Sequence, residues 1–171
     1  MGERSRLAAE PGVHIRGEPA VVTTLHLRRA TKGDVKSVAA LEQLSFSDPW
    51  SAAEFTALLG GKHVVFLVAI DRADSALVGY AIVSAVLEEG EVLNLAVDPS
   101  RRGGGAGGAL LDAGISAAAE VGVRSVFLEV RESNLSARRL YASRGFSEIS
   151  RRRRYYDKPV EDALVLRLAA Q

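Results

Sequence analysis

The strongest constraint on this chain is a glycine-rich segment that separates an apolar strand pattern from a helix pattern. Five of the six residues from Gly103 to Gly108 are glycine, and an amphipathic helix pattern starts at about Gly107. Glycines let backbone N–H groups turn toward one point, and the N-terminus of the following helix adds the positive end of its dipole. The segment therefore predicts a cradle for an anion such as a pyrophosphate. A flexible connector, the alternative, would need neither a strand before it nor a helix after it.

Two other phosphate-binding motifs fit this segment less well. A Walker loop ends in lysine followed by serine or threonine, and neither is present at the end of the segment. The dinucleotide fingerprint GxGxxG is matched by Gly103, Gly105 and Gly108, with Glu129 about twenty residues further on. Five residues nevertheless separate the strand from the first glycine, and the patterns offer one βαβ unit where a doubly wound sheet needs several. A dinucleotide-binding fold is therefore disfavoured.

The hydrophobic patterns predict a single α+β domain. The predicted order is βααβββαβαββ, with strands near 25–29, 64–70, 77–87, 91–97, 123–130, 146–154 and 163–168 and helices near 31–41, 51–59, 107–120 and 134–144. Short connections make the mixed sheet mostly antiparallel, and the helix after the glycine-rich segment makes one parallel βαβ unit. We assign residues 24–171 to this domain. Residues 1–23 mix Gly, Pro, Glu and Arg without a period, which predicts a loosely ordered extension.

Composition excludes several classes of protein and site. The net charge of +1 gives no overall field that attracts nucleic acid or an anionic membrane. The absence of cysteine removes disulfides, thiolate metal sites and cysteine nucleophiles. We expect no bound metal. The longest apolar runs, 63–70 and 78–87, fall well short of the roughly 20 residues that a membrane span needs. No secretory signal precedes Pro11, and we expect a cytoplasmic protein.

Six segments in order resemble one family of enzymes. Residues 102–107 fit the R/Q-x-x-G-x-G/A signature of the GNAT superfamily of acetyltransferases, preceded by that family's usual Leu-Ala-Val-Asp-Pro. The six matching segments beside this signature are 46–51, 94–99, 128–134, 140–146, 153–156 and 161–163. Within the superfamily the chain is similar to the RimI-type ribosomal-protein-alanine N-acetyltransferases, from about Leu25 to Leu168. The main departure is Gly103, where relatives usually carry arginine, so one phosphate-facing charge is lost.

The resemblance implies the three-layer GNAT fold, with acetyl-CoA as cosubstrate, and a set of site residues. It implies that Glu129 is the general base, that Tyr141 is the general acid and that Asn134 binds the pantetheine arm. The residues implied to hold the rest of acetyl-CoA are Leu95, Ala96, Val97, Arg102, Gly103, Gly104, Gly105, Ala106, Gly107 and Gly108.

The residues alone also allow purely structural roles for these side chains. Strand alternation puts Glu129 on the same face as Phe127, where a carboxylate is costly unless it is functional or paired with a cation such as Arg131. Asn134 and Tyr141 are seven residues apart on one helix face, so they can line one groove. Asn134 could also be only a helix cap, and Tyr141 only a core aromatic.

The expected reaction is direct acetyl transfer to a protein N-terminal α-amine, and the resemblance implies the N-terminal alanine of a small-subunit ribosomal protein. An α-amine has a pKa near 7.7–8.0 and a lysine side chain one near 10.4, so deprotonating the α-amine costs about 3.5 kcal/mol less. The alternatives are a small-molecule amine acetyltransferase and a non-catalytic module that docks on RNA or the ribosome.

Two charged clusters bear on the partner. The run from Arg151 to Arg154 alternates between strand faces, which splits the basic patch, so direct nucleic-acid binding is not expected. Tyr155 and Tyr156 are implied to flank the acceptor channel. Glu88, Glu89 and Glu91 are either a solvated turn or a docking surface for a basic peptide.

Overall fold

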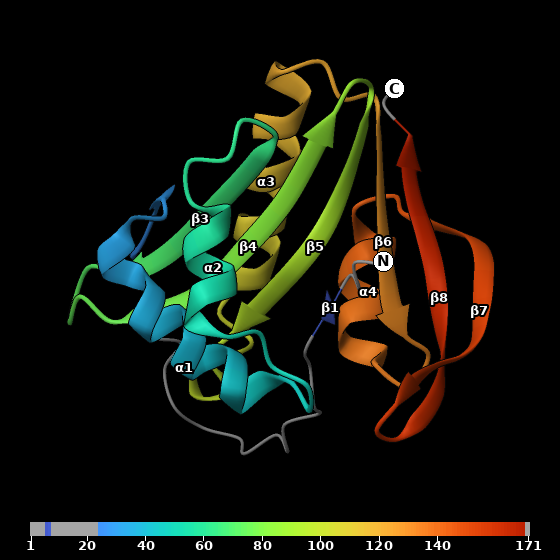
Figure 1. Ribbon diagram of the computed structural model, residues 1–171, viewed down its shortest axis with the longest axis horizontal. Coiled ribbons are helices and arrows are strands. Elements are labelled where there is room, and N and C mark those ends of the chain that lie inside the picture. The colour runs from blue at the N-terminus through green and yellow to red at the C-terminus, as the bar shows by residue number, and fades with distance from the viewer. Residues whose placement is uncertain (1–5, 8–23, 170–171) are drawn as a thin grey trace.

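The computed structural model describes residues 6–7 and 24–169 (Figure 1). The strands are β1 (Arg6–Leu7), β2 (Leu25–Arg29), β3 (Val64–Asp71), β4 (Leu77–Val86), β5 (Glu89–Val97), β6 (Ser125–Arg131), β7 (Ser147–Asp157) and β8 (Val160–Ala169). The helices are α1 (Val35–Ser45), α2 (Ala52–Leu58), α3 (Ala106–Glu120) and α4 (Leu135–Ser143), with 3-10 turns at Lys32–Asp34 and Pro99–Arg101. Strand β1 was not predicted, and the rest of the expected N-terminal extension lies outside the described residues.

The strands form a mixed sheet in the order β2-β3-β4-β5-β6-β8-β7, with β1 added beside β5. Strands β5 and β6 are parallel and are joined by α3, while the other neighbours along that order are antiparallel. The predicted fold class is therefore confirmed, and so is the predicted order of elements from β2 onward.

Capping boxes start the first two helical segments where the sequence indicated them. Thr31 and Asp34 form one box and Ser51 and Glu54 form the other, each pair satisfying backbone N–H groups that the first turn leaves free. The first box opens a 3-10 turn that leads into α1, rather than opening α1 itself.

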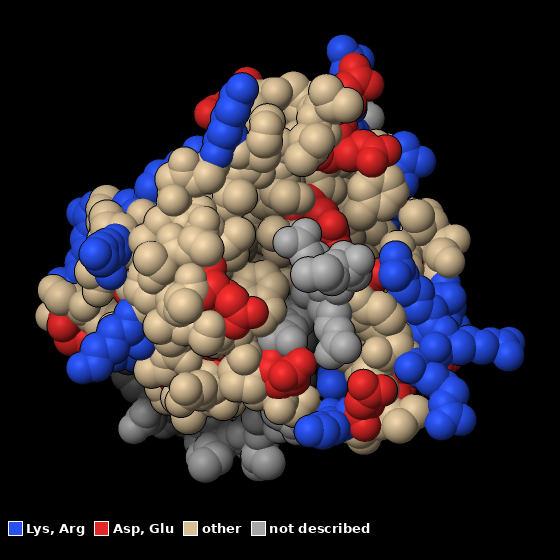
Figure 2. Space-filling model, in the orientation of Figure 1, with Lys and Arg blue, Asp and Glu red and all other residues tan. Residues whose placement is uncertain are grey.

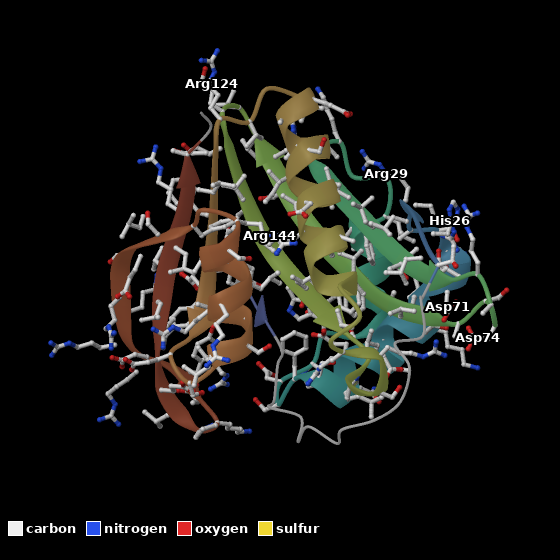
Figure 3. All side chains as sticks on the ribbon, turned by 180° about the vertical axis from the view of Figure 1, so that it is seen from behind. His26, Arg29, Asp71, Asp74, Arg124 and Arg144 are labelled. Carbon is white, nitrogen blue, oxygen red and sulfur yellow. The ribbon has the colours of Figure 1, made fainter. Side chains whose placement is uncertain are left out.

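Helices cover both faces of the sheet. Side chains of α1 and α2 pack on one face around Phe55, Phe66 and Tyr80. Side chains of α3 and α4 pack on the other, around Leu110, Leu128 and Tyr141. Figure 1 shows α1 and α2 in front of the sheet, and Figure 3, seen from behind, shows α3 and α4 on the opposite side. No helix among residues 24–169 is both long and apolar enough to span a bilayer.

The sheet opens in the middle, between β5 and β6. These strands pair only where residues 89–91 of β5 face residues 125–127 of β6. Beyond that point they diverge, and β1 lies between them, paired in parallel with β5 through Arg6 with Asn94 and Leu7 with Leu95 (Figure 1). The carboxyl end of β5, which leads into the glycine-rich segment, borders this opening.

Candidate active site

The glycine-rich segment has a backbone that only glycine adopts without strain at two positions. Asp98 ends β5 and accepts hydrogen bonds from the backbone N and Oγ of Ser100, at 2.8 and 2.7 Å. Gly103 and Gly105 then have φ angles of +83° and +84°, and α3 starts at Ala106. A Cβ at either glycine would meet nothing within 4 Å, so backbone conformation rather than lack of space requires glycine there.

A cavity of about 200 Å³ lies between this segment, the end of β5 and α4. It is lined by Leu95, Ala96, Val97, Arg102, Gly103, Gly105, Ala106, Gly107, Gly108, Ser136, Ala137, Leu140 and Tyr141. Nine of the eleven predicted coenzyme residues are in this set, while Gly104 and Asn134 are not. No acidic side chain occurs among these lining residues, and the N-terminus of α3 faces the cavity. The residues present therefore fit the pyrophosphate and arm of a coenzyme.

Positive charge at the cavity comes from Arg102 rather than from its neighbour Arg101. Arg102 lines the cavity, and its Nε donates to the carbonyl oxygen of Val97 at 3.2 Å. Arg101 instead forms ion pairs with Asp71 at 2.6 Å and Asp74 at 2.5 Å. Figure 3 shows these two aspartates together by the β3–β4 turn. These ion pairs therefore hold the start of the glycine-rich segment against β3 and the β3–β4 turn.

Tyr141 lines the cavity and has a buried hydroxyl. Its side chain is completely buried and packs edge-on against Phe146, with ring centroids 5.6 Å apart. Among the described residues its Oη has no hydrogen-bond partner. Burial raises the pKa of this phenol well above its usual value, and nearby Tyr156 raises it further, so Tyr141 keeps its proton at neutral pH. A protonated hydroxyl without a partner among the described residues, on a side chain that lines the cavity, suits a proton donor.

Glu129 projects from β6 and is only 5% exposed. Its Oε1 lies 2.7 Å from Nε of Arg152 on β7. The sequence alternative, a paired carboxylate, is thus right in kind, but the partner is not Arg131, which pairs with Glu161 at 3.3 Å. Glu129 does not line the coenzyme cavity.

Tyr156 lies close enough to both Glu129 and Tyr141 to interact with each of them electrostatically. Burial raises the pKa of Tyr156 above its usual value, and the charge of Glu129 raises it further. The guanidinium of Arg131 lies over its ring, 4.0 Å from the centroid, and the ring of Tyr155 meets it edge-on. Since Tyr156 also raises the pKa of Tyr141, the three ionisable groups lie within electrostatic range of one another.

Asn134 is the N-cap of α4, as one sequence interpretation held. Its Oδ1 accepts a hydrogen bond from the backbone N of Ala137 at 3.1 Å, and its side chain is buried. Ser136 and Leu140, which the sequence interpretation did not single out, line the cavity beside Tyr141. Both lie on α4 within one turn or so of Tyr141, so helical spacing from Tyr141 could have identified them.

The sequence analysis also missed a buried hydrogen-bond network around a carboxylate between α1 and the sheet. Glu42 of α1 is completely buried and accepts hydrogen bonds from Tyr80 Oη, from Asn94 Nδ2 at 3.2 Å and from the backbone N of Trp50 at 2.9 Å. The sequence did indicate a buried carboxylate here, because Glu42 follows Val38 by four residues and so lies on the apolar face of its helix. The network ties α1 to β5 next to the opening.

The charged clusters lie away from the cavity. Figure 2 shows Lys and Arg gathered along the edge of the molecule that β7 forms, where Arg151 pairs with Glu132 at 2.6 Å. Glu88 lies in the β4–β5 turn and pairs with Arg124 at 3.4 Å. Figure 3 shows Arg124 at the end of the molecule opposite Asp71, which binds the glycine-rich loop. Docking of a basic peptide at the β4–β5 turn therefore stays a prediction without support from the geometry. No cluster of metal-ligating side chains occurs within the described part of the chain.

Comparisons with known proteins agree with this geometry. The family model described as "Acetyltransferase (GNAT) family" matches residues 35–146. The "[Ribosomal protein bS18]-alanine N-acetyltransferase" of Escherichia coli K12 is 35% identical over 137 residues, which cover 79% of this chain and 90% of that protein. The Haemophilus influenzae protein of the same name is 37% identical over 136 residues, or 78% and 90% of the two chains. A crystal structure of the Escherichia coli enzyme superposes with a TM-score of 0.78 at 31% identity, covering 86% of this chain and 95% of that one.

Proposed function

This chain belongs to the GNAT family of acetyltransferases, and from that premise we propose that it acetylates the N-terminal alanine of ribosomal protein bS18. It uses acetyl-CoA as the acetyl donor. The observation that carries the proposed acceptor is the 35% identity to an enzyme named for that reaction, over 90% of its length. The glycine-rich cradle and the protonated hydroxyl of Tyr141 in one cavity support the same chemistry.

The proposed binding roles follow from the cavity lining. When bound, acetyl-CoA supplies an acetyl group activated as a thioester and a thiolate leaving group. The glycine-rich segment and Arg102 would hold its pyrophosphate, because they combine free N–H groups, the α3 dipole and one guanidinium. Leu95, Ala96 and Val97 would present backbone N–H groups to the acetyl carbonyl, and such donors stabilise the charge that develops on its oxygen.

The proposed proton transfers use the two ionisable residues beside the opening. Glu129 would accept the proton of the acceptor ammonium, through water, so that a neutral nitrogen attacks the thioester carbonyl. Tyr141 Oη would then give its proton to the departing sulfur, and its raised pKa means that the phenol still carries that proton at working pH. Asn134 would bind the pantetheine arm while it caps α4. The chain contains no cysteine, and direct transfer needs no covalent acyl-enzyme.

The experiment that tests this function is a panel of acceptors assayed with acetyl-CoA and intact mass as readout. We expect a peptide that starts with the bS18 alanine to be acetylated once, at its α-amine, and lysine peptides with blocked N-termini to remain unmodified. A polyamine or aminoglycoside acetylated far faster than any peptide would replace the proposed acceptor with a small-molecule amine. Absence of transfer to every amine, together with binding to ribosomal RNA, would favour the docking module.

A further inference from the structure

The two sides of the coenzyme cavity come from elements that the sheet does not hold together. The glycine-rich segment and the start of α3 follow β5, whereas α4 follows β6. The cavity is lined by residues 95–97 of β5, which lie beyond Glu91, the last residue of β5 that pairs with β6. β1 lies in the opening, and its pairing is with β5. The separation of α3 from α4 is therefore set by contacts between side chains.

Arg144, the C-cap residue of α4, connects α4 to α3. Its Nε lies 3.2 Å from Oδ1 of Asp112, and its Nη2 lies 3.3 Å from Oδ2, so the guanidinium meets this carboxylate with two donors. Its Nη1 donates to Oγ of Ser143 at 2.9 Å, which further fixes the orientation of the planar group. Figure 3 shows Arg144 between the two helices. Asp112 forms no ion pair with any other described residue, so Arg144 is the partner that holds it.

Gly108 provides the space in which the guanidinium lies against α3. Gly108 is one helical turn before Asp112 and lines the coenzyme cavity. A Cβ at Gly108 would overlap Nη2 of Arg144 and would lie 3.1 Å from its Cζ. Gly103 and Gly105 require glycine because of a positive φ, whereas Gly108 is helical and requires it because of this side chain. Arg144 is not among the cavity-lining residues, so its influence on the cavity passes through the helices that it joins.

We propose that the α3–α4 contact formed by Arg144, Asp112 and Gly108 sets the width of the coenzyme cavity and thereby the affinity for acetyl-CoA. The inference rests on the proposed binding of acetyl-CoA in this cavity. Arg144 is a positioning residue, because it holds α4, with the cavity-lining Leu140 and Tyr141, at a fixed distance from the first turn of α3. The ion pair is partly in solvent, with 33% of the Arg144 side chain and 55% of the Asp112 side chain exposed, so it adds little to global stability. Its loss should therefore weaken coenzyme binding without unfolding the protein.

The experiment measures the affinity for acetyl-CoA by calorimetry in the absence of an acceptor. Arg144→Ala removes the contact from α4, and Asp112→Asn removes the opposite charge from α3. The matched controls are Arg139→Ala on α4 and Glu120→Gln on α3. Each control makes the same change in charge on the same helix, at an exposed residue that forms no ion pair with any described residue.

We expect Arg144→Ala to raise the Kd of acetyl-CoA by about 2–30-fold, the range for substitutions that modulate a ligand site without touching the ligand. Asp112→Asn should raise it less, because the guanidinium still lies against Gly108. Neither control should change it. The kcat with both substrates saturating should stay near that of the parent, since Tyr141 is held in the core against Phe146.

A double-mutant cycle with Gly108→Ala tests how the effect reaches the cavity. In the parent the new methyl group displaces the guanidinium, so Gly108→Ala should weaken binding about as much as Arg144→Ala does. In the Arg144→Ala background no guanidinium remains to be displaced, so the same methyl group should have little further effect. Additive effects of the two substitutions would mean that the methyl group acts on the coenzyme directly, and they would overturn the inference.

Asp112→Asn distinguishes a positioning residue from a direct ligand of the coenzyme. If Arg144 itself bound a phosphate of the coenzyme, Asp112 would compete for the guanidinium, and Asp112→Asn would lower the Kd. A contact that sets the width of the cavity predicts the opposite sign. Tighter binding by Asp112→Asn would therefore overturn the inference, and so would parental affinity in both Arg144→Ala and Asp112→Asn.

Failure of the proposed function has a different signature in these measurements. An error in the proposed acceptor leaves every affinity unchanged, because no acceptor is present. An error in the proposed coenzyme site would instead give Gly105→Asp parental affinity for acetyl-CoA. That result would overturn both the site and the role of Arg144, whatever the Arg144 variants show.

Discussion

Replacing Tyr141 with phenylalanine should raise the stability of the protein and lower its activity. The side chain is completely buried, and its Oη has no hydrogen-bond partner among the described residues. A buried hydroxyl without a partner costs about 1–3 kcal/mol of folding free energy. Tyr141→Phe removes that cost and little packing, so the free energy of unfolding should rise by about 1–3 kcal/mol.

The matched control is Tyr80→Phe. Tyr80 is equally buried, but its hydroxyl donates to the buried carboxylate of Glu42. Hydrogen bonds to charged groups contribute about 1.5–3 kcal/mol, so this variant should be destabilised by that amount. For a chain of this size each kcal/mol shifts the melting temperature by about 2–4 °C, so the two variants should differ by at least about 5 °C.

Scanning calorimetry without acetyl-CoA measures these shifts, and acetyl transfer to the alanine peptide measures the second effect. The kcat of Tyr141→Phe should fall by about 10²–10⁴-fold, the usual contribution of a general acid, with little change in acetyl-CoA affinity. If Tyr141→Phe lowers the melting temperature as much as Tyr80→Phe does, its hydroxyl has a structural partner and the reasoning fails. Retained kcat in a stabilised variant would instead remove Tyr141 from the proton transfer.

Three further predictions follow from the same structure. Gly105→Asp and Gly107→Asp should each abolish binding of acetyl-CoA in calorimetry, because each puts a negative charge where the phosphates are expected; unchanged affinity in both would refute the cradle. Glu129→Gln should lower kcat by about 10²–10⁴-fold at pH 7, and raising the pH should partly restore it because the amine is then already neutral; parental activity at pH 7 would refute the assignment as base. The bidentate pair with Arg28 and the Thr31 contacts lower the pKa of Asp34 to about 2, so its stabilising effect is complete above pH 4 and is lost as the pH falls toward 2. Asp34→Asn should therefore cost about 2 kcal/mol at pH 7 and almost nothing at pH 2, measured by urea unfolding, and a difference that does not depend on pH would contradict the ion pair.

The sequence by itself determined the local features of this protein. Each of these features involves residues within a few positions of each other in the chain. They are the capping boxes at Thr31 and Ser51, the turn at Gly103 and Gly105, and the helix cap at Asn134. Local hydrogen bonds and backbone sterics fix such features, so residue type and spacing predict them. The order of elements followed from hydrophobic period, and nine of the residues expected at the coenzyme line one cavity because they are consecutive or nearly so.

Only the tertiary structure decided which charges meet. Glu129 pairs with Arg152 rather than Arg131, Arg101 pairs with Asp71 instead of lining the cavity, and Glu42 of α1 binds Tyr80 of β4. Each of these contacts joins residues far apart in the chain, and it depends on strand order, on register and on where the β5–β6 pairing ends. A sequence pattern states that a buried carboxylate needs a partner, because desolvating a charge is costly. It does not state which of the several arginines supplies the charge, since only the packed sheet brings one of them within 3 Å of it.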